Sequence, residues 1–272
     1  MKKYTYLNNS VRDGIVSRWT ASTLKVYIAP MNFYTKTGED NKYRKMVMDA
    51  FSVWTGASGG KLRYNIVSSY YDSHINVVWR RVDRKALGHC QFSYDNLQRL
   101  YGAEVSIGLT DGKIHQAYDS EAEVYHTILH EIGHALGLGH SPYESDIMYT
   151  PHRYGVTELS ENDKFSIQCL YTFPAGKSVR EIGAQYSVMT DRDIDMIIRK
   201  LDEKYAQDIE QKENQISSDT DLQTPKAFSG ERDLISETGN LAEIKKYNLM
   251  IQNIGLSDKM KEFFKTQYRD KK

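Results

Sequence analysis

Hydrophobic and polar residues alternate or recur at regular spacing through the first two thirds of the chain. Leu24, Val26 and Ile28 are separated by Lys25 and Tyr27, which predicts a strand. Apolar residues recur at helical spacing over 39–55, so we expect a helix with one buried face. Four short β-rich runs bounded by turn residues then follow, at 62–67, 75–79, 86–92 and 104–109. A strand, a helix and further strands predict a mixed sheet.

Two further helices are predicted by the residues that would begin them. Ser120 and Glu123 form a capping-box signature, in which the serine caps the first turn of a helix. Ser160 and Asp163 do the same for a third helix, which would bury a face of apolar residues. The stretch between these helices, 141–156, has the composition of a loop.

The pattern changes beyond Phe173 and Pro174, which form a natural stop. Apolar residues at helical spacing predict an amphipathic helix over 190–214. Residues 215–236 are rich in Ser, Asp, Thr and Gln, and we expect a flexible linker there. Two short helices would end the chain, near 240–252 and 257–268, and could dock on the domain or on a partner.

The chain is therefore expected to have three parts. A loose lead-in would occupy 1–16, a main domain 17–173, and a helical extension 174–272. Because every proposed functional residue lies before Phe173, residues 1–176 should fold and act alone.

Composition narrows the classes of function. The 272 residues include 36 basic and 36 acidic side chains, and a net charge of zero argues against a nucleic-acid-binding protein that relies on a basic field. No run of eighteen apolar residues could span a membrane. The basic start at Lys2 and Lys3 is followed by polar residues, so no signal peptide is predicted. Cys90 and Cys169 could form a disulfide or remain two buried thiols.

The most informative segment reads HEIGHALGLGH, at 130–140. His130 and His134 are four residues apart, so they lie on one face of a helix and could both bind one zinc ion. The glycines that follow let the helix end and the chain turn back, which would bring His140 to the same ion. Three protein ligands leave a fourth position open for water, as catalytic zinc sites require. Glu131 is not needed as a ligand and could take a proton from that water.

The other histidines are weaker candidates as ligands. His126 lies one turn before His130 on the same helical face, but about 12 Å of helix would then have to converge on one ion. We interpret His126 as a supporting or core residue. His74, His115 and His152 are interpreted as surface or packing residues, and His152 could also contact substrate.

This segment resembles the metzincin metallopeptidases, and most closely their matrixin branch. Ser141 after the third histidine fits that branch, as does Met148 followed by Tyr149. The likeness extends to Trp19, to AFSVW at 50–54 and to LSENDKFSIQCLY at 159–171, and thus covers about residues 17–173. Nothing after that region resembles the haemopexin-like domain that often follows.

The resemblance implies a metzincin-like α+β catalytic domain with a mixed sheet and three helices. It implies that His130, His134 and His140 bind zinc, that Glu131 is the general base, and that Met148 forms a hydrophobic floor under the metal. The strand 86–92 would be the rim of a substrate cleft, and 151–155 would wall the pocket for the residue after the cut bond. The cleft residues would include Leu87, Gly88, His89, Pro151, His152 and Tyr154.

The chain also departs from the family pattern. The strand 104–109 has no histidine and His89 is a single remaining candidate, so a second, structural zinc is not expected. Asp95, Glu104 and Asp111 leave a structural calcium site open. The family's cysteine-containing propeptide motif is missing. The resemblance favours a secreted, extracellular protein.

These observations predict a zinc-dependent endopeptidase that cleaves protein or peptide substrates through a metal-activated water. Two alternatives remain open. One is a zinc-loaded but inactive module that binds peptides, and the other is a structural zinc protein, which would need a fourth protein ligand.

Overall fold

The computed structural model describes residues 3–31, 39–81, 87–109 and 120–220, with side chains described to residue 211. Asp111, His115 and both predicted C-terminal helices lie outside the described residues. Among the described residues, no helix combines the length and hydrophobicity needed to cross a bilayer.

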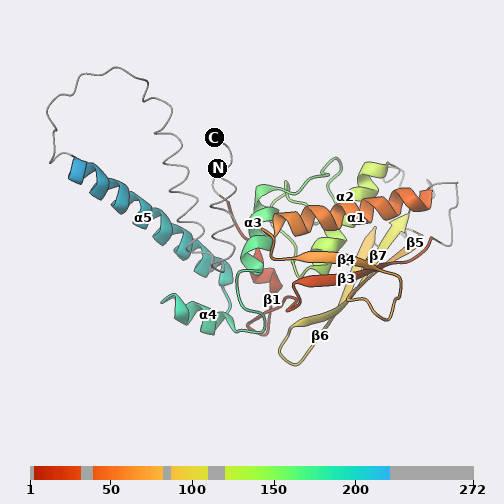
Figure 1. The fold of residues 1–272 in the computed structure, drawn as a ribbon, viewed down its shortest axis with the longest axis horizontal. Helices are drawn as coiled ribbons and strands as arrows, with labels where there is room; N and C mark the ends of the chain where they lie inside the picture. Colours follow the sequence, from red (N-terminus) through yellow and green to blue (C-terminus); the bar gives the residue numbers. More distant parts are fainter. Residues whose placement is uncertain (1–2, 32–38, 82–86, 110–119, 221–272) are drawn as a thin grey trace, which may run out of the picture. The chain divides into compact units, whose positions relative to one another are not determined.

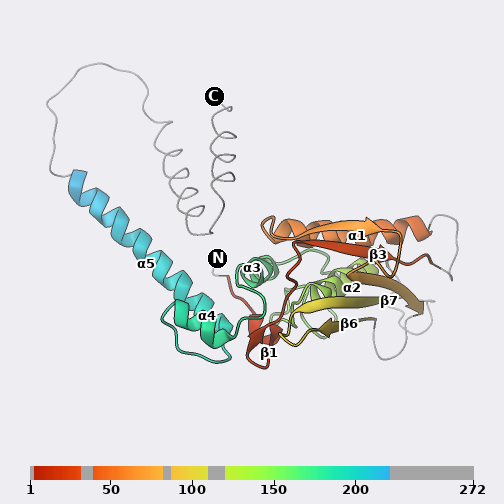
Figure 2. The same cartoon turned by 60° about the horizontal axis from the view of Figure 1, so that its bottom comes forward.

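A five-stranded mixed sheet organises the fold (Figure 1). Its order is β4 (Arg63–Val67), β3 (Thr23–Ile28), β5 (Ile75–Arg81), β7 (Leu100–Leu109) and β6 (Gly88–Tyr94). Four strands are parallel, whereas β6 runs antiparallel to β7 at the edge of the sheet (Figure 2). The predicted mixed sheet and its strands are confirmed, although β7 begins four residues before the predicted start and β5 ends two residues beyond the predicted end.

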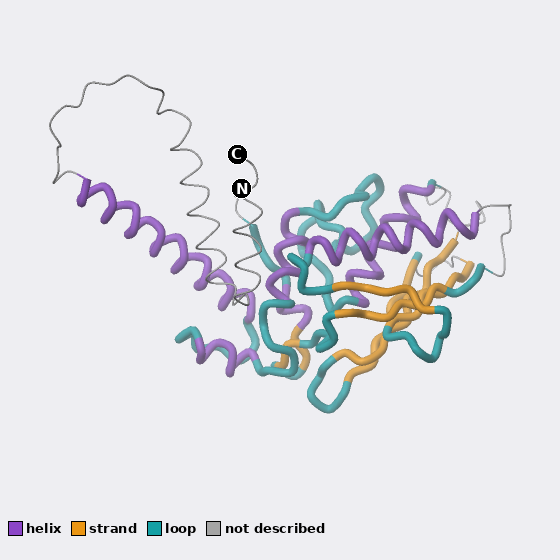
Figure 3. The backbone as a smooth tube through the Cα atoms, viewed as in Figure 1, coloured by secondary structure: helices purple, strands orange, loops and turns teal. Residues whose placement is uncertain are grey.

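Three helices accompany the sheet, as predicted: α1 (Glu39–Ala57), α2 (Glu121–Ala135) and α3 (Glu161–Leu170). α1 and α2 pack on each other and on the sheet, and α3 packs on α1. Ser120 and Ser160 cap α2 and α3, and at α3 the Asp163 carboxylate completes a reciprocal capping box. The segment between α2 and α3 is a loop (Figure 3), which agrees with its composition.

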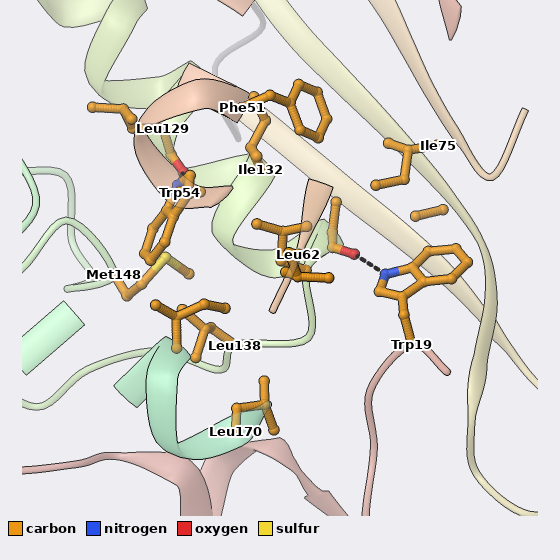
Figure 4. Close-up of a cluster of buried hydrophobic side chains, with 14 of the residues drawn as sticks. Trp19, Phe51, Trp54, Leu62, Ile75, Leu129, Ile132, Leu138, Met148 and Leu170 are labelled. Carbon is orange, nitrogen blue, oxygen red and sulfur yellow. Dashed lines mark hydrogen bonds between the residues drawn. The ribbon is translucent and has the colours of Figure 1, made fainter. Parts of the chain in front are cut away.

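Two buried tryptophans connect the sheet and α1 to α2. The indole of Trp19 donates to the carbonyl of Ala135 at 2.8 Å, and the indole of Trp54 donates to the carbonyl of Leu129 at 2.9 Å. Figure 4 shows both rings within the cluster of buried side chains, with Met148 beside Trp54. A buried indole N–H requires an acceptor, so these bonds fix the position of α2, the helix that carries the first two motif histidines.

The expectation of a loose lead-in is wrong. A 3-10 helix, η1 (Leu7–Ser10), is followed by a hairpin of β1 (Val11–Arg12) and β2 (Ile15–Val16). The hairpin turn is Asp13-Gly14, and both residues have positive φ. Asp-Gly is a strong hairpin signal, but strands of two residues are too short to produce the alternation on which the sequence analysis relied.

The expected boundary at residue 174 is also displaced, because residues 176–198 pack on the N-terminal segment. The Val16 N–H donates to the carbonyl of Lys177 at 3.0 Å, and the Val179 N–H to that of Gly14 at 2.8 Å. The Asp195 carboxylate accepts from the N–H groups of Leu7 and Asn8 at 2.8 and 3.0 Å. The first of two compact units accordingly extends from Met1 to Ile209.

Two helices form this later region. α4 (Val179–Gln185), which was not predicted, begins with a capping box of Ser178 and Glu181. α5 (Ile194–Thr220) confirms the predicted amphipathic helix but continues to Thr220. The predicted linker at 215–236 is therefore wrong for its first six residues, and the rest of it lies outside the described residues.

We expect a fragment of residues 1–211 to unfold at the same urea concentration as the first unit of the full chain. A fragment of residues 1–176 should unfold at a much lower urea concentration or not fold at all. The shorter fragment lacks the buried side chains Val179, Ile182, Ile194 and Ile197. Each buried aliphatic side chain contributes about 1.5–3 kcal/mol, and a whole domain is stable by only about 5–15 kcal/mol. Urea unfolding followed by circular dichroism compares the fragments. Equal midpoints would show that residues 177–198 are dispensable for folding.

Candidate metal centre

The three motif histidines converge where α2 ends. The Nε2 atom of His134 lies 3.1 Å from that of His130 and 3.2 Å from that of His140. Tetrahedral zinc with Zn–N distances near 2.0–2.1 Å requires its nitrogen ligands to be about 3.3 Å apart. Among the described residues, these histidines form the sole group of three or more His, Cys, Asp or Glu side chains placed to hold one metal ion.

Backbone carbonyls determine which ring nitrogen faces the other histidines. The Nδ1 atom of His130 is 2.8 Å from the carbonyl oxygen of Ile147, and that of His134 is 2.8 Å from that of Leu138. A carbonyl can only accept, so Nδ1 carries the proton in each ring and Nε2 keeps a lone pair. Burial lowers the pKa of His134 to about 4 and holds the pKa of His130 well below its usual value. The rings are therefore neutral, and lone pairs facing each other at this distance fit a bound cation such as zinc.

A sharp turn returns the chain to the metal centre. α2 ends at Ala135, and Gly137 has a φ of 101°, which strongly favours glycine. The His140 carbonyl then accepts a hydrogen bond from the Asn9 side chain at 2.7 Å. The Gly139 N–H donates to the Ser10 hydroxyl at 3.2 Å. The loop that carries the third histidine is thus held by η1, a segment that the sequence analysis did not connect with the site.

Glu131 is buried beside the histidines, with 7% of its surface exposed. Its carboxyl group lies against Gly88 of β6, where an added β-carbon would come within 2.6 Å of Oε1. Burial raises the pKa of Glu131 to about 8, and the charge of Arg80 partly opposes this shift. A carboxyl group with a pKa near neutrality is suited to accepting and returning a proton.

The loop after His140 packs beneath the metal centre. The Ser141 N–H donates to the Met148 carbonyl at 2.8 Å, and the Met148 side chain is fully buried. One carboxylate oxygen of Asp163 accepts from the Ile147 N–H at 2.8 Å, and the other accepts from the Tyr6 hydroxyl at 2.6 Å. These bonds hold the Ile147 peptide, whose carbonyl fixes the ring of His130.

A cavity of about 540 Å³ opens beside the three histidines, between β6, α2 and the loop 149–152. Five of the predicted cleft residues line it, namely Leu87, Gly88, His89, Pro151 and His152. Tyr154 does not; its side chain is 55% exposed and packs edge-on against His152. Cys90 and Phe92 of the predicted rim strand also line the cavity, as do His126, Thr127, Tyr149 and Thr150, which the sequence analysis did not assign to it.

One end of this cavity contains a cluster of polar side chains. His126 is buried and its Nδ1 donates to the Val156 carbonyl at 2.7 Å, so it is a core residue, as interpreted, and not part of the metal-binding group. His152 is a packing residue, which was one of the two interpretations offered for it: its Nε2 lies 2.7 Å from a carboxylate oxygen of Glu123, and its ring packs on His126 with centroids 4.1 Å apart. The other Glu123 oxygen accepts from the Gly155 N–H at 3.0 Å.

The remaining sequence candidates lie elsewhere. Cys90 in β6 and Cys169 in α3 are free thiols, so they do not form the disulfide that was one alternative. Asp95 forms an ion pair with Arg99 at 2.6 Å. Glu104 accepts from the Tyr70 hydroxyl at 3.3 Å. No calcium site is shown by these contacts.

Known proteins share sequence with this region. The family profile described as Matrixin matches residues 18–172. Metalloendoproteinase 1 of Glycine max is 27% identical over 174 residues, which cover 57% of this chain and 52% of that protein. Karilysin of Tannerella forsythia is 27% identical over 176 residues, which cover 61% of this chain and 35% of karilysin. The chain thus spans about half or less of the length of these relatives.

We expect the metal-free protein to lose stability as the pH falls from 6.5 toward 4. Burial lowers the pKa values of His126 and His134 to about 4, whereas the same side chains in the unfolded chain titrate near 6.5. In this window the unfolded chain binds more protons, so the contribution of the neutral rings is complete above pH 6.5 and is lost as the pH falls through 4.

Urea unfolding with a chelator present, repeated across this pH range, measures the effect. His126→Gln removes one of these groups and leaves every motif histidine in place, so it should flatten the pH dependence. A free energy of unfolding that stays constant across the window in the chelated wild-type protein would contradict the expectation.

Proposed function

The chain belongs to the matrixin family of metalloendopeptidases, and we propose that it is itself a zinc-dependent endopeptidase that hydrolyses peptide bonds in proteins. The observation that carries this proposal is the metal centre itself. Three imidazole Nε2 atoms converge beside a buried carboxyl group, and carbonyl hydrogen bonds fix the tautomers of two of the rings. Three ligands leave an open coordination position, which distinguishes a catalytic site from a structural one.

We assign the zinc ligands as His130, His134 and His140. Zinc would supply a Lewis acid that polarises the scissile carbonyl group and lowers the pKa of a water molecule at the open position. The carbonyls of Ile147 and Leu138 keep two ligand rings oriented and increase their basicity. Met148, buried under this loop, is assigned as the hydrophobic floor.

We assign Glu131 as the general base. Its carboxyl group would hold the attacking water, accept a proton from it, and then deliver that proton to the leaving amine. Burial supports this role, because a carboxylate poorly solvated by water binds a proton more readily than a surface carboxylate.

The edge strand β6 is proposed as the rim along which substrate binds. A peptide could pair with this edge by strand addition, next to Leu87, Gly88 and His89. The cavity walled by Pro151 and His152 would then take a substrate side chain beside the cut bond. An extracellular location and a structural calcium ion remain proposals from the family resemblance.

We expect Glu131→Gln to retain zinc but to lose at least about 100-fold in kcat, because the metal ligands stay while the base is removed. His134→Ala should lose both zinc and activity, because two nitrogens bind the ion weakly. Glu121→Gln is the matched control, since Glu121 lies on the first turn of the same helix and is exposed.

Metal analysis and cleavage of a generic quenched peptide library measure these effects. A fully active Glu131→Gln protein would refute the assigned base. A wild-type protein that holds zinc and binds peptides but cleaves none would instead support the inactive binding module.

We also expect Gly88→Ala to lower kcat/KM by about tenfold or more while zinc is retained, because the added methyl group would displace the Glu131 carboxyl group. Gly102→Ala on the adjacent strand β7 is the control, since its added β-carbon would come no closer than 3.7 Å to the Ser93 side chain. Equal activity of the two variants would show that β6 does not restrict the position of Glu131.

A further inference from the structure

A second hollow, of about 330 Å³, adjoins the metal centre on the side of the N-terminal segment. It shares Phe92, His134 and His140 with the first cavity, so the two hollows meet at the metal centre. Its other wall includes η1 and β1, which contribute Asn9 and Arg12. A peptide that crosses the metal centre would therefore have one side near the first cavity and the other near this hollow.

Among the described residues, Arg12 is the only Lys, Arg, Asp or Glu side chain that lines this hollow. Its guanidinium carbon lies 4.4 Å from the ring centre of Tyr94 and 5.4 Å from that of Phe92, both on β6. Cation–π contacts of this kind favour one position for the side chain without neutralising its charge. The described residues that line the first cavity include no Lys or Arg.

The backbone that carries Arg12 is also fixed. Arg12 pairs with Ile15 across the hairpin, directly before the Asp13-Gly14 turn. The strand beyond the turn is bonded to the Lys177–Val179 segment. The guanidinium group is therefore presented by a folded hairpin.

The charge of Arg12 is not paired within the described part of the chain. No carboxylate there forms an ion pair with it. The adjacent Asp13 instead accepts from the Gln98 side chain at 3.3 Å. Ser17, also in the lining, has a buried hydroxyl oxygen without a hydrogen-bond partner among the described residues. The hollow thus offers an unpaired cation and an unused hydroxyl next to the metal centre.

We propose that Arg12 binds an acidic side chain of the substrate, and that the enzyme therefore prefers Asp or Glu at one position near the cut bond. The inference rests on the proposed endopeptidase function, because a peptide across the metal centre supplies the carboxylate. A planar guanidinium group can donate two parallel hydrogen bonds to a carboxylate. Since Arg12 lies in only one of the two hollows, the preference is confined to one side of the cut bond.

Cleavage of a proteome-derived peptide library, with the cut sites read by mass spectrometry, tests the proposal. The wild-type enzyme should enrich Asp and Glu by up to about fivefold at one position, the upper value expected from one exposed ion pair. Arg12→Gln should lose this enrichment, and Arg12→Glu should replace it with enrichment of Lys and Arg. Arg63→Gln is the control, since Arg63 is an exposed arginine on β4, the opposite edge of the sheet.

Two quenched peptides that differ only by Glu or Gln at the enriched position provide a second measurement. Their ratio of kcat/KM should approach one at about 1 M salt, where charges are screened beyond about 3 Å. A wild-type enzyme without an acidic preference, or a preference that survives in Arg12→Gln, overturns the inference and leaves the endopeptidase function standing. Failure of the zinc-loaded wild-type protein to cut any peptide overturns the proposed function, and the inference with it.

Discussion

Two backbone carbonyl groups hold the metal centre in its geometry. The oxygens of Leu138 and Ile147 accept from the Nδ1–H groups of His134 and His130, and this leaves both Nε2 lone pairs facing the same point. A free imidazole could rotate or change tautomer, and its Nε2 would then not be available to a metal. Both carbonyls lie beyond the end of α2, so the site exists only if the chain turns sharply after that helix. The positive φ of Gly137 provides this turn.

Support for these carbonyls comes from both ends of the described chain. Asp163 holds the Ile147 peptide and is itself bonded by Tyr6 from the N-terminal segment. The same segment bonds the His140 carbonyl through Asn9, and it is capped in turn by Asp195 of α5. The matrixin match ends at residue 172, so the support from Asp195 comes from beyond the region shared with the family. The segments before and after the matrixin match are thus linked by hydrogen bonds to the backbone of His140, the third histidine.

The two hollows beside the metal centre differ in charge, which bears on substrate choice. The first is lined by His126 and His152, with the Glu123 carboxylate against the His152 ring, and the described residues of its lining include no Lys or Arg. The second presents the Arg12 guanidinium over two aromatic rings of β6. A substrate that crosses the centre would therefore meet different electrostatic environments before and after the cut bond. This asymmetry arises because one wall belongs to α2 and the other to the N-terminal hairpin.

The sequence by itself indicated the histidine cluster, the sheet and the main helices. These features depend on spacing of four residues along a helix, alternation along a strand, and capping residues, all of which are local. Only the tertiary structure decided which distant residues meet. Leu7 and Asp195 form a hydrogen bond although they are 188 residues apart in the chain. Arg12, in a strand of only two residues, places its guanidinium group over the ring of Phe92. No periodicity records such contacts, so the boundary at 174 and the loose lead-in were both wrong: hydrogen bonds join each segment to the other.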